Sequence, residues 1–179
     1  MVNTSRKLML AIVVAFLTIA GSTSYAAPGK SKGVGGWEPS ADHREYVVIS
    51  LKTDPVYGDP EPACVALQIG MNLLMGSVPD SEGNPTSVTP ADKVVLFTTI
   101  GGVELINPGQ DLSANVCLTP GGMGSLSNLL QGFVNLGGEV VVCPLCAITR
   151  DITNPTHGVM GSGVGIHNLF LNADKVVDF

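Results

Sequence analysis

The chain has 179 residues, of which 45% are hydrophobic and 13% are charged, and its formal net charge is −6. This length suits one ordinary domain. The excess of acidic side chains argues against nucleic acid as a partner, because nucleic-acid binding depends on Lys and Arg side chains that neutralise phosphates.

The first 26 residues have the pattern of a secretory signal peptide. Arg6 and Lys7 are basic, the thirteen residues of 8–20 are largely apolar, and Ser24 and Ala26 are small residues at the −3 and −1 positions of a cleavage site. This apolar segment is too short for an uncleaved membrane anchor, since a helix that spans a bilayer needs about 20 residues. We therefore expect cleavage after Ala26 and an exported, periplasmic protein that is not bound to a membrane.

Residues 27–44 begin with a stretch rich in Gly, Pro and Ser, which predicts a flexible arm before a domain at 45–179. Within the domain, segments with the apolar pattern of buried strands alternate with segments that have apolar residues at helical spacing. We expect, in chain order, a strand over 45–51, a helix from Pro62, a loop over 77–92, a strand over 93–100, a loop over 107–124, a helix over 126–136 capped by Ser125, a strand over 139–143, a short helix from Pro144, a helical segment within 163–173 and a strand over 174–179.

The alternation of strands and helices predicts the fold class. Strands that are apolar throughout belong to an α/β fold, in which helices cover both faces of a parallel sheet. Ligand chemistry in such sheets lies beyond the carboxyl ends of the strands. Because the strand over 139–143 ends in a cysteine, we expect Cys143 at this edge of the sheet.

The sequence Cys-Pro-Leu-Cys at 143–146 carries the main functional prediction. Pro144 fits the first turn of a helix, so that Cys143 becomes the N-cap, where the helix dipole stabilises an anion. Thiols in such settings have pKa values of roughly 3.5–7.5, and the thiolate is the nucleophile. We predict that Cys143 is the nucleophile, that Cys146 resolves a persulfide or disulfide one turn later, and that Arg150 favours the Cys146 thiolate or an anionic sulfur ligand.

Three alternatives stay open for the pair. Cys146 is an ordinary core residue in the first, since free cysteine packs as a small hydrophobe. In the second the pair binds a metal ion, but a closed zinc site needs four ligands, and the spacing of His157 and His167 from the pair matches no known pattern. In the third, Cys143 and Cys146 form an inert disulfide.

The remaining candidates are weaker. Cys64 lies on the apolar face of its predicted helix, which favours buried packing, and Cys117 lies in a predicted loop; the sequence leaves open whether they pair. Glu104 follows a strand and is either a base near the cysteines or, more commonly for such a position, an exposed loop carboxylate. His157 is expected in solvent. The Gly-Gly-Met-Gly of 121–124 lacks the further glycines and the lysine of a phosphate loop, so we predict no cofactor and no resident metal.

Four segments resemble the DsrE/DsrF-like family, which includes sulfur-relay subunits of the TusD type. They are CVALQIGMNLL at 64–74, KVVLFTTIGGVEL at 93–105, LSNLLQGFVNLGGEVVVCPLCAITRDI at 126–152 and NADKVVDF at 172–179. The resemblance covers most of residues 45–179. Its most specific parts are the strand-end cysteine, which is followed by a short helix with an arginine, and the closing strand.

The resemblance implies a three-layer α/β/α sandwich with a mainly parallel sheet of about five strands, in a homo-oligomer that is a trimer or a hexamer. It also implies that the cysteine at the position of Cys143 carries sulfur as a persulfide, and Cys146 matches a family variant with a C-x-x-C motif. Relay subunits of the family work in the cytoplasm, whereas this chain carries an export signal. Neither tRNA thiolation nor the cytoplasmic partners are therefore carried over.

We accordingly predict an exported sulfur-handling thiol protein, either a sulfurtransferase or a stoichiometric carrier, whose sulfur donor and acceptor proteins the sequence does not identify. Two alternatives remain. One is a non-catalytic, oligomeric binding module of the same fold, and the other is a protein of thiol–disulfide exchange or copper handling that uses the same two cysteines.

Overall fold

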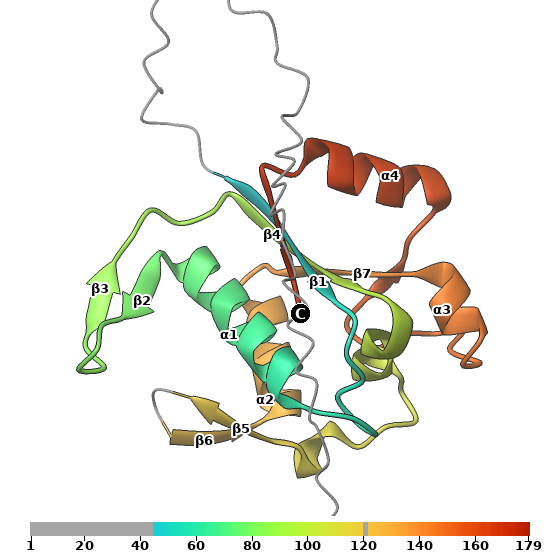
Figure 1. The fold of residues 1–179 in the computed structure, drawn as a ribbon, viewed down its shortest axis with the longest axis horizontal. Helices are drawn as coiled ribbons and strands as arrows, with labels where there is room; N and C mark the ends of the chain where they lie inside the picture. Colours follow the sequence, from blue (N-terminus) through green and yellow to red (C-terminus); the bar gives the residue numbers. More distant parts are fainter. Residues whose placement is uncertain (1–44, 120–121) are drawn as a thin grey trace, which may run out of the picture. The chain divides into compact units, whose positions relative to one another are not determined.

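The computed structural model describes residues 45–119 and 122–179, so the predicted signal peptide and arm lie outside the described residues. The centre of the fold is a five-stranded sheet (Figure 1). Its strands, in spatial order, are β8 (Val159–Met160), β7 (Glu139–Val142), β4 (Lys93–Thr98), β1 (Tyr46–Leu51) and β9 (Lys175–Asp178). Every neighbouring pair in this sheet is parallel. The α/β fold class predicted from the sequence is confirmed.

Helices cover both faces of the sheet (Figure 1). On one face α1 (Glu61–Met75) and α2 (Leu126–Asn135) enclose the main core, to which β1 contributes alternate side chains such as Val47 and Ile49. On the other face, α4 (Gly163–Asn172) closes a smaller core, where Leu169 packs on Val48 and its neighbours. These three layers arise because alternate residues of a strand point to opposite faces.

Two helix ends carry the signals that the sequence predicted, at Ser125 and Pro144, and a third, at Gly76, was not predicted. The Ser125 hydroxyl accepts a hydrogen bond from the backbone N–H of Asn128 at 3.2 Å and so caps α2. The helix α1 ends at Gly76, whose φ of 64° lies in the left-handed region that glycine adopts readily. The short helix α3 (Pro144–Ile148) begins at Pro144, as predicted.

The predicted loops contain structure that the sequence pattern did not reveal. Residues 77–92 include a hairpin of β2 (Ser77–Pro79) and β3 (Pro85–Ser87), and residues 107–124 include the 3-10 helix η2 (Leu112–Ala114) and most of a hairpin of β5 (Val116–Thr119) and β6 (Gly122–Ser125). Short, largely exposed strands lack the long apolar run by which a buried strand is recognised. The β2–β3 turn instead depends on Asp80, whose carboxylate accepts hydrogen bonds from the backbone N–H groups of Glu82 and Asn84.

The strand predicted over 93–100 ends earlier, at Thr98, and the 3-10 helix η1 (Ile100–Ile106) follows it. Gly101 and Gly102 allow this turn, because both N–H groups donate to the carbonyl of Lys52 and a Cβ on Gly102 would collide with the carbonyl oxygen of Leu51. The early end of β4 brings η1 to the carboxyl edge of the sheet.

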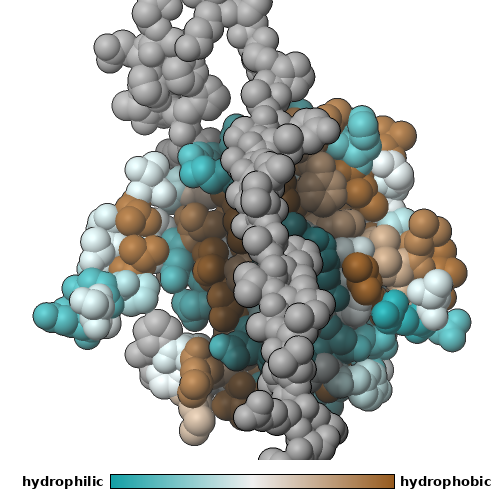
Figure 2. Space-filling model, in the orientation of Figure 1, coloured by the Kyte–Doolittle hydropathy of each residue, from teal (hydrophilic) through white to brown (hydrophobic). Residues whose placement is uncertain are grey.

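Apolar side chains remain exposed on α4, on the two edge strands of the sheet and around α3, and Figure 2 shows exposed apolar residues on the right of the molecule. On α4 and the two edge strands they are Val159, Met160, Val164, Phe170, Leu171, Val176 and Val177. The predicted trimer or hexamer stays a prediction, for which these side chains offer apolar surface. No helix among the described residues is long and apolar enough to cross a membrane.

Candidate functional site

The candidate site lies where β4 and β7 end side by side. In the parallel register Thr98 is opposite Val142, and the backbone N–H of Cys143 donates to the carbonyl of Thr98 at 2.9 Å. Cys143 therefore stands next to Thr99 at the carboxyl edge of the sheet, and α3 then places Cys146 beside the same residue. This is the edge at which the sequence analysis expected chemistry.

Cys143 and Cys146 are both free thiols and both are partly buried. They pack on different sides of the sheet, because Cys143 contacts the smaller core below α4 whereas Cys146 contacts the main core. The Cys143 side chain is nevertheless near enough to the Cys146 sulfur to contribute to lowering the pKa of that thiol. The alternative of an inert disulfide between them is not what the structure contains.

The sulfur of Cys146 has polar partners from the neighbouring strand end. Its Sγ lies 3.4 Å from Oγ1 of Thr99, and the backbone N–H of Ile100 is near enough to contribute to lowering the pKa of the thiol. Burial raises the pKa of the Cys146 thiol, but the hydrogen bonds of Thr99, Cys143 and Ile100, together with the charge of Arg150, hold that pKa below its ordinary value. Cys146 is thus a thiol that ionises readily.

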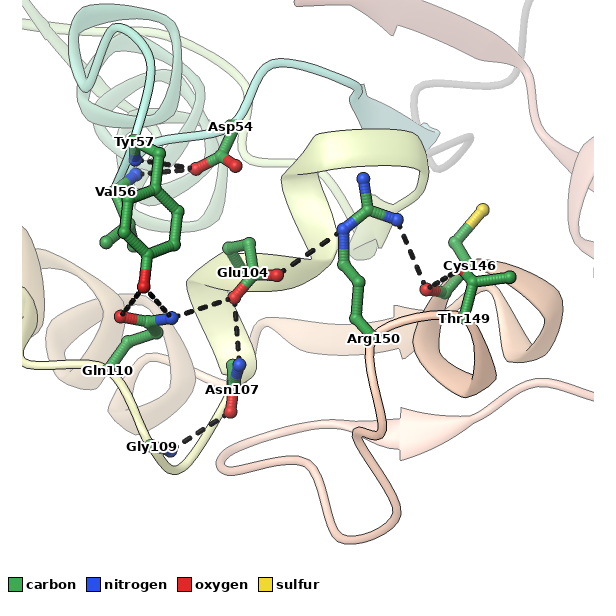
Figure 3. Close-up of polar contacts among 10 residues, drawn as sticks. All are labelled: Asp54, Val56, Tyr57, Glu104, Asn107, Gly109, Gln110, Cys146, Thr149 and Arg150. Atoms are coloured by element: carbon green, nitrogen blue, oxygen red, sulfur yellow. Dashed lines mark hydrogen bonds and ion pairs between the residues drawn. The ribbon is translucent and has the colours of Figure 1, made fainter.

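Arg150 is held between two acceptors at this site, as Figure 3 shows. Its Nε lies 3.4 Å from Oε1 of Glu104, and its Nη1 donates to the backbone carbonyl of Cys146 at 3.3 Å. The guanidinium group therefore reaches the backbone of α3, and its charge acts on the Cys146 sulfur from there.

Glu104 is buried, with a side chain only 8% exposed, so the prediction of an exposed loop carboxylate is wrong. The 3-10 helix η1 turns it inward, where its Oε2 accepts hydrogen bonds from Asn107 at 2.8 Å and from Gln110 at 3.1 Å. Gln110 in turn donates to the hydroxyl of Tyr57 at 3.1 Å (Figure 3). Both carboxylate oxygens are engaged, which is the condition for burying a charge, and Glu104 acts as an anchor for Arg150.

Ile100 has a backbone conformation that β-branched residues rarely adopt, with φ of 50°. Its neighbours impose it, because the N–H of Thr99 bonds to the carbonyl of Leu51 and the N–H of Gly101 bonds to that of Lys52. Such outliers are frequent at functional sites, where the surrounding structure holds them. Here the outlier lies at the point where the backbone meets the Cys146 sulfur.

The structure thus brings together Cys143, Cys146 and Arg150, the three site residues that the sequence analysis named. It adds Thr99 and Ile100, which that analysis missed because it ran the strand through residue 100. The available signal was the parallel sheet itself, since the residue after one buried strand lies next to the residue after its neighbour.

The other two cysteines form a disulfide, Cys64–Cys117, which joins α1 to β5 with a Cα–Cα distance of 5.5 Å. Both residues belong to the main core. Cys64 is buried, as predicted, and Cys117 is its partner. The question that the sequence left open is answered, and this pair is structural.

The remaining candidates do not join the site. His157 and His167 are exposed, and within residues 45–119 and 122–179 no group of three or more His, Cys, Asp or Glu side chains could hold a metal ion. Of the glycine-rich segment 121–124, the described residues 122–124 form part of β6 in a hairpin.

Comparison with protein-family models and with curated proteins gave no match. Among solved structures, the chain is similar to the YchN protein from E. coli, with a TM-score of 0.53 and 21% identity over 75% of this chain and 99% of that chain. At this identity the likeness concerns the fold. It confirms the α/β fold, with its mainly parallel five-stranded sheet and flanking helices.

Proposed function

We propose that the chain handles sulfane sulfur, which it holds as a persulfide on one cysteine of the Cys143–Cys146 pair and releases through the other. The observation that carries this proposal is a pair of free thiols in contact at the carboxyl edge of a parallel sheet, one of which has a lowered pKa. A thiolate at that position is ready to attack a sulfur atom, and a second thiol within reach is ready to resolve the product.

The loading step is an exchange of sulfur–sulfur bonds. The thiolate attacks the terminal sulfur of an inorganic polysulfide, a new bond forms between the cysteine and that sulfur, and the shortened polysulfide leaves with the electron pair of the broken bond. The cysteine then carries a persulfide. Because the polysulfide is itself the oxidised partner, loading needs no further oxidant.

Release follows one of two routes. The second cysteine attacks the inner sulfur of the persulfide, so that a protein disulfide forms and hydrosulfide leaves; a dithiol reductant then restores both thiols with two electrons and two protons. In the other route the thiolate of an acceptor protein attacks the outer sulfur, the persulfide passes to that protein, and the chain regains its thiolate. The first route describes an enzyme that reduces sulfane sulfur, and the second describes a carrier or sulfurtransferase.

Apolar side chains around the pair support an acceptor that is a protein. Leu145 lies between the two cysteines and Ile148 follows them on α3, whereas Ile100 follows β4, and the three side chains are exposed by 74%, 66% and 57%. Exposed apolar residues that gather at one place are typical of surfaces that contact other proteins. The thiol of an acceptor that covers these side chains would reach the outer sulfur of the persulfide.

The proposal includes export to an oxidising compartment. The signal-peptide pattern of residues 1–26 supports it. The disulfide between Cys64 and Cys117 is also in keeping with it, because structural disulfides persist in exported proteins and are rare in the cytosol.

Intact-mass spectrometry after incubation with polysulfide tests the proposed function. In the wild type we expect a gain of one sulfur atom that a reductant removes or, where the second cysteine has resolved the persulfide, a loss of two hydrogens. A variant in which one cysteine of the pair is replaced by Ser cannot resolve the persulfide and should retain the added sulfur. The variant Cys143→Ser/Cys146→Ser, which keeps the Cys64–Cys117 disulfide, serves as the matched control, and a gain of sulfur in it would contradict the proposal. A loss of two hydrogens in the wild type, with no sulfur retained by either single-cysteine variant, would favour thiol–disulfide exchange instead.

A further inference from the structure

The two cysteines of the pair differ in what surrounds their sulfur atoms. The sulfur of Cys146 meets the Thr99 hydroxyl at 3.4 Å, the Cys143 thiol and the backbone N–H of Ile100. Cys143 occupies the N-cap position of α3, but its side chain makes no capping hydrogen bond. Hydrogen-bond donors that converge on one sulfur stabilise the negative charge there.

We propose that Cys146, and not Cys143, is the thiolate that attacks sulfane sulfur, and that the Thr99 hydroxyl and the Ile100 backbone N–H form a cradle for its charge. This proposal rests on the proposed function and exchanges the roles that the sequence analysis predicted for the two cysteines. Thr99 contacts the reacting atom in this scheme, so it is a catalytic residue.

The helix dipole contributes little to stabilising a thiolate on Cys143. The helix α3 has only 5 residues, and the thiol of Cys143 does not bond to its N-terminal N–H groups. The dipole effect falls off within the first turn and depends on partners that face those groups. Cys143 thus occupies the predicted N-cap position, but its thiol makes no capping hydrogen bond.

The cradle is built into the fold at the end of β4. Hydrogen bonds from Thr99 to Leu51 and from Gly102 to Thr99 fix the backbone on both sides of Ile100. They hold Ile100 at its φ of 50°, so that its N–H points toward the sulfur. A donor that is fixed before the reaction needs no rearrangement when the charge forms or moves.

The charged groups near Cys146 favour the same assignment. Arg150 is bonded to the Cys146 carbonyl and anchored by the buried Glu104 on η1, and the thiol of Cys143 is the other titratable group in contact. At the same edge, Lys52 and Asp178 at the ends of β1 and β9 form an ion pair with each other at 2.9 Å. Arg150 thus supplies the positive charge at α3, and Glu104 is its positioning residue.

The same surroundings set the order of the steps. The Cys143 side chain contributes to lowering the pKa of the Cys146 thiol, and Cys146 is therefore the cysteine that attacks first. Once the persulfide is on Cys146, Cys143 attacks the inner sulfur, its proton goes to the outer sulfur, and hydrosulfide leaves as the Cys143–Cys146 disulfide forms. Atoms and charge balance, and a dithiol reductant supplies the two electrons that reset the pair.

Single-cysteine variants separate the two roles, with inorganic polysulfide as the sulfur source and intact mass as the measurement. We expect Cys143→Ser to gain one sulfur atom and to retain it, because the resolving thiol is gone, and Cys146→Ser to load at least about tenfold more slowly. Loading of Cys146→Ser at the wild-type rate, together with a failure of Cys143→Ser to load, would overturn the assignment.

Variants at Thr99 test the cradle without any sulfur chemistry. In the Cys143→Ser background, where Cys146 is the free thiol, Thr99→Val should lower the rate of alkylation by iodoacetamide near neutral pH by about tenfold, the effect of one hydrogen bond to a charged group. Thr99→Ser should keep the rate, since it keeps the hydroxyl, and thermal unfolding of both variants checks their folding. Equal rates in the valine and serine variants would overturn the cradle.

These two measurements also distinguish failure of the further inference from failure of the proposed function. If alkylation follows the Thr99 hydroxyl but neither single-cysteine variant takes up sulfur, then the cradle stands and the sulfur-handling function falls. If Cys146→Ser takes up sulfur on Cys143 at the wild-type rate and Cys143→Ser takes up none, then the function stands and the assignment of Cys146 falls.

Discussion

The two pairs of cysteines show how one side chain serves two purposes in one fold. Cys64 and Cys117 lie in the core between the sheet and the α1–α2 layer, and they are bonded across a sequence separation of 53 residues. Cys143 and Cys146 lie at the carboxyl edge of the sheet, three positions apart, partly buried and unbonded. The first pair is thus buried and far apart in the sequence, whereas the second pair is partly buried and close in the sequence.

The difference has a physical consequence for each pair. A bond that closes a long loop removes many conformations from the unfolded chain, whereas a bond across a C-x-x-C turn removes few. The first pair is therefore suited to stabilise the fold. The second contributes little stability when bonded, so its thiols are available to form and break bonds with sulfur.

The largest effect should come from removing the core disulfide. We expect Cys64→Ala/Cys117→Ala to lower the free energy of unfolding by about 4 kcal/mol, as the loop-closure relation gives for a separation of this size, measured by urea denaturation. Cys143→Ser/Cys146→Ser is the matched control, and it should change the stability by less than about 1 kcal/mol. An equal loss in both double variants would break the comparison.

The next effect concerns the anchor of Arg150. Glu104→Gln removes a buried charge and replaces one acceptor oxygen by an amide NH2 group. This group cannot accept a hydrogen bond from Asn107, Gln110 or Arg150, so the free energy of unfolding should fall by about 2 kcal/mol. Asp178→Asn is the control, because it breaks an exposed ion pair at the same edge and should cost less than about 0.5 kcal/mol. Similar losses in both variants, again from urea denaturation, would mean that Glu104 has no special role.

The pH dependence of alkylation should separate the pairs further. Because its pKa is lowered, the thiol of Cys146 should react with iodoacetamide with a midpoint below that of an ordinary cysteine thiol. The rate should fall as the pH drops through the pKa of the folded state. The thiolate also contributes to the stability of the fold, because its pKa is lower in the folded than in the unfolded protein. This stability is present at pH values above the pKa of the unfolded thiol and is lost as the pH falls through the pKa of the folded one.

Peptide mapping of the alkylated wild-type protein measures this profile for each cysteine. Cys64 and Cys117 should remain unmodified over the whole range, since they are bonded and buried. A midpoint for Cys146 at or above that of a free thiol compound would contradict the stabilised thiolate.

The smallest effect should follow from relief of the strained residue. Ile100→Gly removes a side chain that is 57% exposed and permits the positive φ at no steric cost, so the free energy of unfolding should rise by about 1 kcal/mol or less. The backbone N–H stays in place, and alkylation of Cys146 should therefore be retained. A loss of stability in this variant would show that the Ile100 side chain contributes packing that exceeds the strain.

Much of the fold could be predicted because its signals are local. The apolar runs of β1 and β4, the Ser125 cap of α2 and the Pro144 start of α3 each depend on residues that are close in sequence. The hairpins of β2–β3 and β5–β6 could not be predicted because their strands are short and largely exposed. The second hairpin is also bonded to α1 by a disulfide between residues that are distant in the sequence. Pairing of that kind depends on the tertiary structure.

The candidate site divides in the same way. Cys143, Cys146 and Arg150 could be predicted together because one short segment carries them. Thr99 and Ile100 come from another strand end, and only the parallel register places them beside Cys146. The burial of Glu104 could not be predicted from the sequence either, since it depends on η1 turning a residue after β4 back into the core.

The contrast between a structural pair and a sulfur-carrying pair is tested most directly by locating added sulfur in the Cys143→Ser protein, which lacks the resolving thiol. The measurement is peptide mass spectrometry after incubation with polysulfide, with no reductant present. We predict an additional sulfur atom only on Cys146, in the peptide that contains residues 143–146, with Cys64 and Cys117 recovered as a disulfide. Added sulfur on Cys64 or Cys117, with the 143–146 peptide unchanged, would contradict the proposed division between the two pairs.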